Sequence, residues 1–274
     1  MDTRKTALVT GASQGVGREI ADILAGKGWN LVLVARNREK LTALKEELRE
    51  KYDISADCIS ADLSQPAASR QLFEHCIKEG LTVDLLVNNA GCGLFGESVE
   101  LGEETLSMLQ LNMVTLTGLC MSFGKQMKKR GSGSILNIGS IAGNQPTAYF
   151  ASYAASKSYV LTYSLALRQE LKPYGVNVTC AQPGYIRTNF DKSCNITSET
   201  YKRFSYKNGM SARSVARGAV KAVLARRSYV RIGVMNKCAA FFSALLPRNL
   251  LAALLATSIK NMTKDSTKGT LHED

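Results

Sequence analysis

The stretch TALVTGASQGVG, residues 6–17, decides the fold. Its first five residues are apolar or β-branched and predict a buried strand. Glycines follow at once, and a helical spacing of apolar residues begins at Gly15. Such a turn lets the backbone approach a pyrophosphate, which then lies at the positive end of the helix. We therefore expect this turn to bind the phosphates of a dinucleotide through Gly11, Ser13, Gln14, Gly15, Val16 and Gly17.

The rest of the chain repeats this alternation of strand and helix. Further strands are predicted over residues 31–35, 55–60, 85–88, 134–138, 177–181 and 228–232. Helical spacing is found over residues 15–27, 38–51, 67–79, 103–130, 153–172 and 211–225. Strands that alternate with helices through short connections predict an α/β fold. The expected architecture is a three-layer, doubly wound parallel sheet (a Rossmann fold) of about seven strands. No linker interrupts it, so residues 1–274 are expected to form one domain.

The composition narrows the possible chemistry. The chain has 274 residues, of which 45% are hydrophobic and 21% charged, so it can bury a sizeable core. Its seven cysteines are odd in number and none has CxxC spacing, which favours free thiols in a reducing, cytoplasmic setting. Only His75 and His272 are present, so we expect neither a histidine-based metal site nor a Ser-His-Asp triad.

Neither end of the chain predicts a membrane span. Residues 1–13 lack the apolar core of a signal peptide. The apolar segment from Cys238 to Ile259 is broken by Pro247, Arg248 and Asn249, and each half is too short to cross a bilayer. We expect residues 239–264 to form a basic and apolar C-terminal helical extension.

The formal net charge of +12 is unevenly distributed. From Lys202 to Lys264 there are thirteen Lys and Arg residues and no Asp or Glu. Arg213, Arg217 and Lys221 share one face of a predicted helix. That face could be solvated, with the extension packed on the domain or on a second subunit. It could instead contact an anionic membrane surface or the anionic carrier of an acyl group. No nucleic-acid-binding motif is present, so no nucleic acid partner is expected.

A second pattern follows the strand at residues 134–138. Ser140 ends that strand, and Tyr153 and Lys157 lie four residues apart on one face of the next helix. An ammonium near a phenol should lower the pKa of that phenol toward the working range of a general acid or base. Ser140 can polarise a carbonyl group by a hydrogen bond. The set suits proton exchange with a carbonyl oxygen that gains negative charge as a hydride arrives.

Five motifs in order resemble those of the short-chain dehydrogenase/reductase family, over about residues 5–190. They are TGASQGVG at 10–17, Asp62-Leu63, NNAG at 88–91, the Tyr153–Lys157 pair, and Pro183-Gly184 with Thr188. The resemblance implies an oxidoreductase that interconverts a ketone and a secondary alcohol. It adds Asn112 to Ser140, Tyr153 and Lys157 as catalytic residues, and it gives Lys157 a contact with the nicotinamide ribose.

The same resemblance implies further cofactor contacts and an oligomer. Asp62 and Leu63 would hold the adenine, and the remaining contacts would come from Asn89, Ala90, Gly91, Tyr153, Pro183, Gly184, Ile186 and Thr188. The long helices near residues 103–130 and 153–172 would pair subunits into a homodimer or homotetramer.

The residues after the second strand choose between NAD and NADP. An acidic residue there would bind the ribose 2′-hydroxyl of NAD. The chain reads Ala35-Arg36-Asn37-Arg38, with no carboxylate before Glu39. A guanidinium can bind a 2′-phosphate through paired, charged hydrogen bonds. We therefore expect NADP rather than NAD, with Arg36 and Ser13 at the phosphate.

Aromatic and apolar residues gather in two segments that should border the substrate. These are residues 141–150, after the strand at 134–138, and a loop at residues 185–206, after the strand at 177–181. The aromatic and apolar residues are Ile141, Tyr149, Phe150, Tyr185, Phe190, Tyr201, Phe204 and Tyr206. They predict a hydrophobic ketone or alcohol, such as a long-chain 3-keto lipid or acyl compound, with a hydroxysteroid as the alternative. A nucleotide-binding protein without turnover is the alternative of another class. The complete set of Asn112, Ser140, Tyr153 and Lys157 argues against it.

Overall fold

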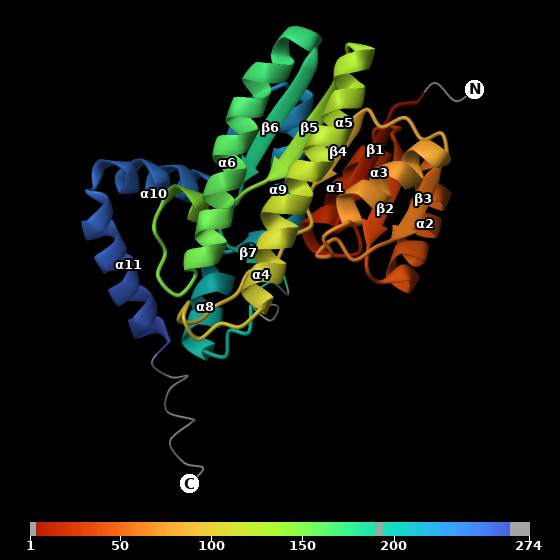
Figure 1. Ribbon diagram of the computed structural model, residues 1–274. Coiled ribbons are helices and arrows are strands. Elements are labelled where there is room, and N and C mark those ends of the chain that lie inside the picture. The colour runs from red at the N-terminus through yellow and green to blue at the C-terminus, as the bar shows by residue number, and fades with distance from the viewer. Residues whose placement is uncertain (1–3, 189, 191–193, 264–274) are drawn as a thin grey trace.

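The computed structural model describes residues 4–188, 190 and 194–263, and a parallel sheet of seven strands forms its centre (Figure 1). The strand order is β3-β2-β1-β4-β5-β6-β9. The strands are β1 (Thr6–Thr10), β2 (Asn30–Ala35), β3 (Ala56–Ser60), β4 (Leu85–Asn88), β5 (Gly133–Ile138), β6 (Val176–Gln182) and β9 (Tyr229–Arg231). The winding direction reverses between β1 and β4. The predicted doubly wound α/β sheet is therefore confirmed.

The central strands are apolar because helices cover both of their faces. Every residue of β4 and β6 is buried, as is β1 from Ala7 to Thr10. Ala7 and Val9 face one hydrophobic core and Leu8 faces the other. A strand buried on both sides gives a continuous apolar run instead of an alternating one. This is why the sequence predicts these strands to within about a residue.

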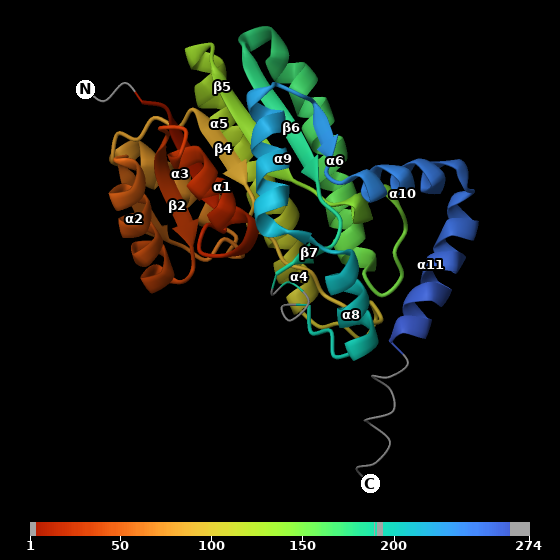
Figure 2. The same cartoon turned by 180° about the vertical axis from the view of Figure 1, so that it is seen from behind.

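Six helices form the two outer layers. The first layer contains α1 (Gly15–Ala25), α2 (Arg38–Tyr52) and α9 (Ala212–Leu224), which Figure 2 shows on one face of the sheet. The second contains α3 (Ala68–Lys78), α5 (Leu116–Arg130) and α6 (Ala151–Leu171), which Figure 1 shows on the other.

The helix predicted over residues 103–130 is not one continuous α-helix. It consists of α4 (Glu104–Leu109), a π-helical turn η1 (Gln110–Thr115) and α5. Among the described residues, this is the one helix whose length and composition could cross a membrane. Its residues Leu119, Phe123 and Met127 are fully or almost fully buried in the core beneath the sheet. Packing in this core accounts for the apolar residues on that face of the helix.

The chain after β6 departs most from the predicted pattern. The expected loop at residues 185–206 contains β7 (Ile186–Arg187) and most of α8 (Glu199–Asn208), and β8 (Met210–Ser211) follows. Residues 189 and 191–193 lie outside the described part. The predicted extension 239–264 is two helices, α10 (Val234–Leu245) and α11 (Arg248–Met262). It begins earlier than predicted because β9 ends at Arg231, and Pro247 separates the helices. Lys264 lies outside the described residues.

Candidate active site

A cavity of about 1300 Å³ opens over the carboxyl ends of the strands. It lies at the reversal between β1 and β4, where ligands bind in open α/β sheets. Of the residues predicted for the site, all but Gly17 and Asn112 line it. Those that do are Gly11, Ser13, Gln14, Gly15, Val16, Arg36, Asp62, Leu63, Asn89, Ala90, Gly91, Ser140, Tyr153, Lys157, Pro183, Gly184, Ile186 and Thr188.

The turn after β1 has a backbone conformation and a close packing that require glycine. Gly11 has φ +65° and Gly15 has φ +57°, a left-handed backbone that favours glycine. A Cβ atom on Gly17 would lie 2.2 Å from the carbonyl oxygen of Gly11, so Gly17 supports the turn from behind. The Gln14 side chain does not cap α1, and the first turn of this helix carries no acidic residue. Its backbone N–H groups are therefore suited to an anion.

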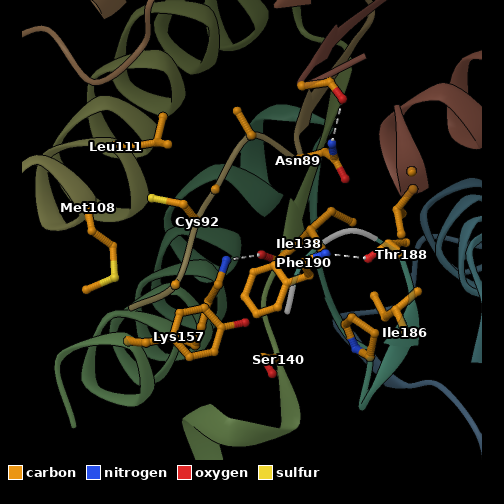
Figure 3. A pocket seen from close by; sticks show the side chains of 18 of the residues that line it. Asn89, Cys92, Met108, Leu111, Ile138, Ser140, Lys157, Ile186, Thr188 and Phe190 are labelled. Atoms are coloured by element: carbon orange, nitrogen blue, oxygen red, sulfur yellow. Dashed lines mark hydrogen bonds between the residues drawn. The ribbon is translucent and has the colours of Figure 1, made fainter. Parts of the chain in front are cut away.

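Hydrogen bonds join the end of β1 to the end of β4. The Thr10 hydroxyl donates to the Val87 carbonyl at 3.2 Å and accepts from the N–H groups of Asn89 and Ala90, each at 3.0 Å. The Asn89 side-chain amide donates to the Thr10 carbonyl at 2.9 Å. These bonds hold both loops around the cavity, where Figure 3 shows Asn89 opposite the group formed by Lys157 and Ser140.

The end of the cavity near β2 is cationic. Arg36 and Lys40 line it, whereas Glu39 does not. Among the described residues, neither Arg36 nor Lys40 forms a salt bridge. The Asp62 carboxylate accepts hydrogen bonds from the Ser64 backbone and hydroxyl, which lower the pKa of Asp62. Sequence reasoning missed Lys40, whose signal was its place in the first turn after the helix cap at Asn37.

Ser140, Tyr153 and Lys157 line the other end of the cavity, and Figure 3 shows Ser140 and Lys157 there. Burial raises the pKa of the Tyr153 phenol well above its ordinary value, although a hydrogen bond with Ser140 acts in the opposite direction. The expected lowering of this pKa is therefore wrong for this structure. The Lys157 ammonium donates to the Ile138 carbonyl at 3.0 Å and lies 5.8 Å from the centre of the Tyr153 ring. Burial lowers the pKa of Lys157 to about 8.

Asn112 lies one layer behind the cavity wall, in the π-helical turn. Its amide donates to the Cys92 carbonyl at 2.9 Å and to the Ser156 hydroxyl at 3.1 Å, and its oxygen accepts from the Cys92 N–H at 3.2 Å. A Cβ atom on Gly91 would lie 3.0 Å from the Asn112 side-chain oxygen and 3.3 Å from the Lys157 nitrogen. Gly91 thus lets Asn112 and Lys157 approach the same point.

An aromatic cluster forms the wall beside Tyr153. Phe150 lies 5.1 Å from Phe95, and Phe190 lies 5.5 Å from Tyr153, between ring centres. Five of the eight predicted wall residues line the cavity, namely Ile141, Phe150, Tyr185, Phe190 and Tyr201. The other three, Tyr149, Phe204 and Tyr206, do not. Sequence reasoning missed Cys92, Met108 and Leu111, which line the cavity and come from segments near β4 and α4 with no aromatic or polar pattern of their own. It also missed Phe95, which packs against the aromatic cluster without lining the cavity.

The three cations predicted on α9 are not equivalent. The Arg213 guanidinium forms ion pairs with Glu19, at 2.9 Å, and with Asp22. It therefore joins α9 to α1 and is not available to an outside anion. Arg217 and Lys221 are exposed.

This chain is similar to known proteins in sequence and in structure. The family described as short chain dehydrogenase matches residues 5–199. A very-long-chain 3-oxoacyl-CoA reductase of Phaeosphaeria nodorum is 35% identical over 193 residues, which are 68% of this chain and 56% of that protein. A diacetyl reductase, (S)-acetoin forming, of Staphylococcus epidermidis is 33% identical over 186 residues, which are 67% of this chain and 72% of that protein.

The solved structures include a short-chain dehydrogenase of Sphingobium yanoikuyae in complex with NADPH. It is 30% identical, covers 88% of this chain and 93% of its own, and gives a TM-score of 0.78. The matched part of this chain spans little more than half the length of the fungal reductase.

Proposed function

The chain belongs to the short-chain dehydrogenase/reductase family, and from that premise we propose that it reduces a hydrophobic ketone to a secondary alcohol with NADPH. As a member it is an oxidoreductase acting on CH–OH and C=O groups. The observation that carries the finer proposal is the cavity itself. It has the glycine turn, with Arg36 and Lys40, at one end and Ser140, Tyr153 and Lys157 at the other.

The residues present fit a nicotinamide dinucleotide phosphate. The glycine turn and the start of α1 would hold the pyrophosphate, because no side chain caps the first N–H groups of this helix. Gly17 keeps the turn in this shape, since a side chain there would collide with the Gly11 carbonyl. Arg36 and Lys40 would hold the 2′-phosphate, with Ser13 beside them. Asp62 and Leu63 would border the adenine. When bound, the cofactor supplies the hydride.

The chain's own residues supply the proton. Because burial raises the pKa of Tyr153, its phenol is protonated at neutral pH and can donate from its Oη atom to the substrate oxygen. The Ser140 hydroxyl orients the same oxygen. Lys157, backed by Asn112, supports proton return to Tyr153 while its ammonium stays charged.

The aromatic wall supports an apolar substrate. The cluster around Phe150, Phe190 and Tyr201 leaves few polar partners for a small, polar ketone. The fungal relative is a very-long-chain 3-oxoacyl-CoA reductase, which supports a long-chain 3-keto lipid or acyl compound as the substrate class. We also propose that the protein is a homodimer or homotetramer.

The experiment is NADPH oxidation with a panel of ketones. The panel holds a small diketone, 3-keto acyl compounds of increasing chain length, free and as thioesters, and a steroid ketone. We expect kcat/KM to rise with chain length and NADPH to be used in preference to NADH. Equal rates on short and long ketones would contradict the substrate class. Preference for the steroid ketone would support the alternative, a hydroxysteroid substrate.

A further inference from the structure

Helices α10 and α11 project from the side of the sheet and meet at Pro247 (Figure 1, Figure 2). We name residues 234–262 the C-terminal arm. The first helix of the arm contacts η2 (Ile141–Asn144), and the second contacts α8. Figure 2 shows the arm apart from α9, the helix that carries Arg213, Arg217 and Lys221.

Helix α10 has its apolar side chains on the exposed side and small or polar side chains on the side that packs on the protein. The side that packs on the protein carries Ala240, which is buried, and Asn236 and Ser243, which are half-buried. The opposite side carries an exposed apolar stripe at i, i+4, i+7 and i+11, formed by Val234, Cys238, Phe241 and Leu245. Phe241, Phe242 and Leu245 are 61%, 65% and 65% exposed. A continuous apolar surface of this kind indicates an interaction site.

The charges around the stripe favour an anionic occupant. Lys237, Arg248 and Lys260 are exposed on the arm, and no acidic residue lies between Lys202 and Lys264. A second copy of this chain would bring the same cations face to face, which like-charge repulsion opposes. A surface that is apolar inside and anionic outside satisfies both features. An anionic phospholipid bilayer is such a surface.

We propose that the C-terminal arm docks this protein on an anionic phospholipid bilayer. The apolar stripe of α10 enters the boundary between headgroups and acyl chains, and the cations of the arm contact the headgroups. The arm thus takes the role that the sequence suggested for the face of Arg213, Arg217 and Lys221.

The arm is also connected to the wall of the cavity. The Ser198 hydroxyl donates to the Met262 carbonyl at the end of α11, at 2.6 Å, and accepts from the Tyr201 N–H at 3.1 Å. Met262 packs against the aromatic cluster, and Tyr201 and Ser205 of α8 line the cavity. Helix α10, which carries the stripe, contacts η2, whose Ile141 and Ala142 also line the cavity. Docking would therefore bring the bilayer close to the cavity, so an apolar ketone could enter from the lipid. This last step rests on the proposed function, whereas docking does not.

The test is co-sedimentation with vesicles, without substrate. Wild type should bind vesicles of phosphatidylcholine mixed with phosphatidylglycerol and bind more weakly to phosphatidylcholine alone or at high salt. The triple variant Phe241→Glu, Phe242→Glu, Leu245→Glu should bind at least about tenfold more weakly, because each change replaces an exposed apolar side chain that would enter the bilayer with a negatively charged one. Its turnover of a small, soluble ketone and its melting temperature should stay at the wild-type values.

Two control variants identify the surface. Val99→Glu changes a side chain that is 87% exposed and lies outside the arm, and Arg217→Gln with Lys221→Gln removes the free cations of α9. Both should bind vesicles like wild type. The proposal is overturned if wild type stays in the supernatant at low salt, or if the α9 variant alone loses binding. It is also overturned if the triple variant only dissociates an oligomer. Ketone reduction is measured in a separate assay, so failure of vesicle binding can be distinguished from failure of the proposed reductase activity.

Discussion

At the scale of single residues, the charges at the end of the cavity near β2 should decide between NADPH and NADH. Arg36 and Lys40 line the end near β2, whereas Glu39 does not line the cavity. A cation there attracts a 2′-phosphate, and an acid would repel it. The proposed preference for NADPH therefore depends on very few side chains.

The Arg36→Asp variant tests this directly. We expect the Kd of NADPH to rise roughly ten- to a hundredfold, corresponding to about 1.5–3 kcal/mol for a lost charge-assisted hydrogen bond. The Kd of NADH should fall or stay constant. Fluorescence titration of both cofactors measures this. Wild type that binds NADH as tightly as NADPH would show that Arg36 does not select the cofactor.

Lys157 predicts a pH limit on reduction. Burial lowers its pKa to about 8, so its ammonium is intact below that pH and is lost as the pH rises through it. Because the ammonium supports proton return to Tyr153, kcat/KM for ketone reduction should be level near pH 7 and fall above about pH 8. A pH profile at saturating NADPH measures it. A rate that stays level or climbs up to pH 10 would contradict this role.

At the scale of elements, the turn between β1 and α1 is the most constrained. Gly17→Ala would place a methyl group against the Gly11 carbonyl, since the ideal Cβ lies 2.2 Å from that oxygen. We expect overpacking to cost about 1–3 kcal/mol of unfolding free energy and to weaken NADPH binding strongly. Thermal unfolding and cofactor titration measure the two effects.

Gly28→Ala is the matched control for Gly17→Ala. Gly28 has φ +76° and no atom near its ideal Cβ, so alanine there should cost about 1–2 kcal/mol through backbone strain alone. Its NADPH affinity should stay at the wild-type value. Equal loss of affinity in both variants would mean that stability, and not the shape of the turn, controls binding.

Elements were predictable where local pattern and burial agree. Strands β1, β4 and β6 are apolar runs, and the sequence predicts them. The π-helical turn around Asn112 was not predictable, because the partners of Asn112 are the Cys92 backbone and the Ser156 hydroxyl, 20 and 44 residues away. The sequence predicts a loop where α8 forms, because the aromatic residues there indicate a pocket wall, and Tyr201 does line the cavity.

At the scale of the whole molecule, long-range pairing decides which surfaces are free. Arg213 is paired with Glu19 and Asp22, which lie 194 and 191 residues away in the chain. No local pattern predicts such a pair, so the sequence overestimated the free cations on α9. The predicted catalytic set depends less on such contacts, because the ends of β4 and β5 and the start of α6 meet in any sheet of this order. As catalytic groups its members stay predictions.

The proposed oligomer makes its own prediction. Leu106, Val114 and Met121 are exposed along α4, η1 and α5, although this helix is otherwise packed on the sheet. If these side chains pair subunits, Val114→Glu with Met121→Glu should lower the mass measured by light scattering to that of a smaller species. Val99→Glu should leave the mass unchanged. Wild type that is already monomeric would rule out this interface.

The central claim is that Tyr153 protonates a ketone oxygen in an NADPH-dependent reductase. The most direct measurement is NADPH oxidation by wild type and by Tyr153→Phe, on the best ketone of the panel, with NADPH affinity titrated for both. Removing the Oη atom removes the proton donor and leaves the ring packed against Phe190. We predict that turnover falls at least about 10²-fold while the Kd of NADPH stays within about twofold. Turnover by Tyr153→Phe at the wild-type rate would contradict the account.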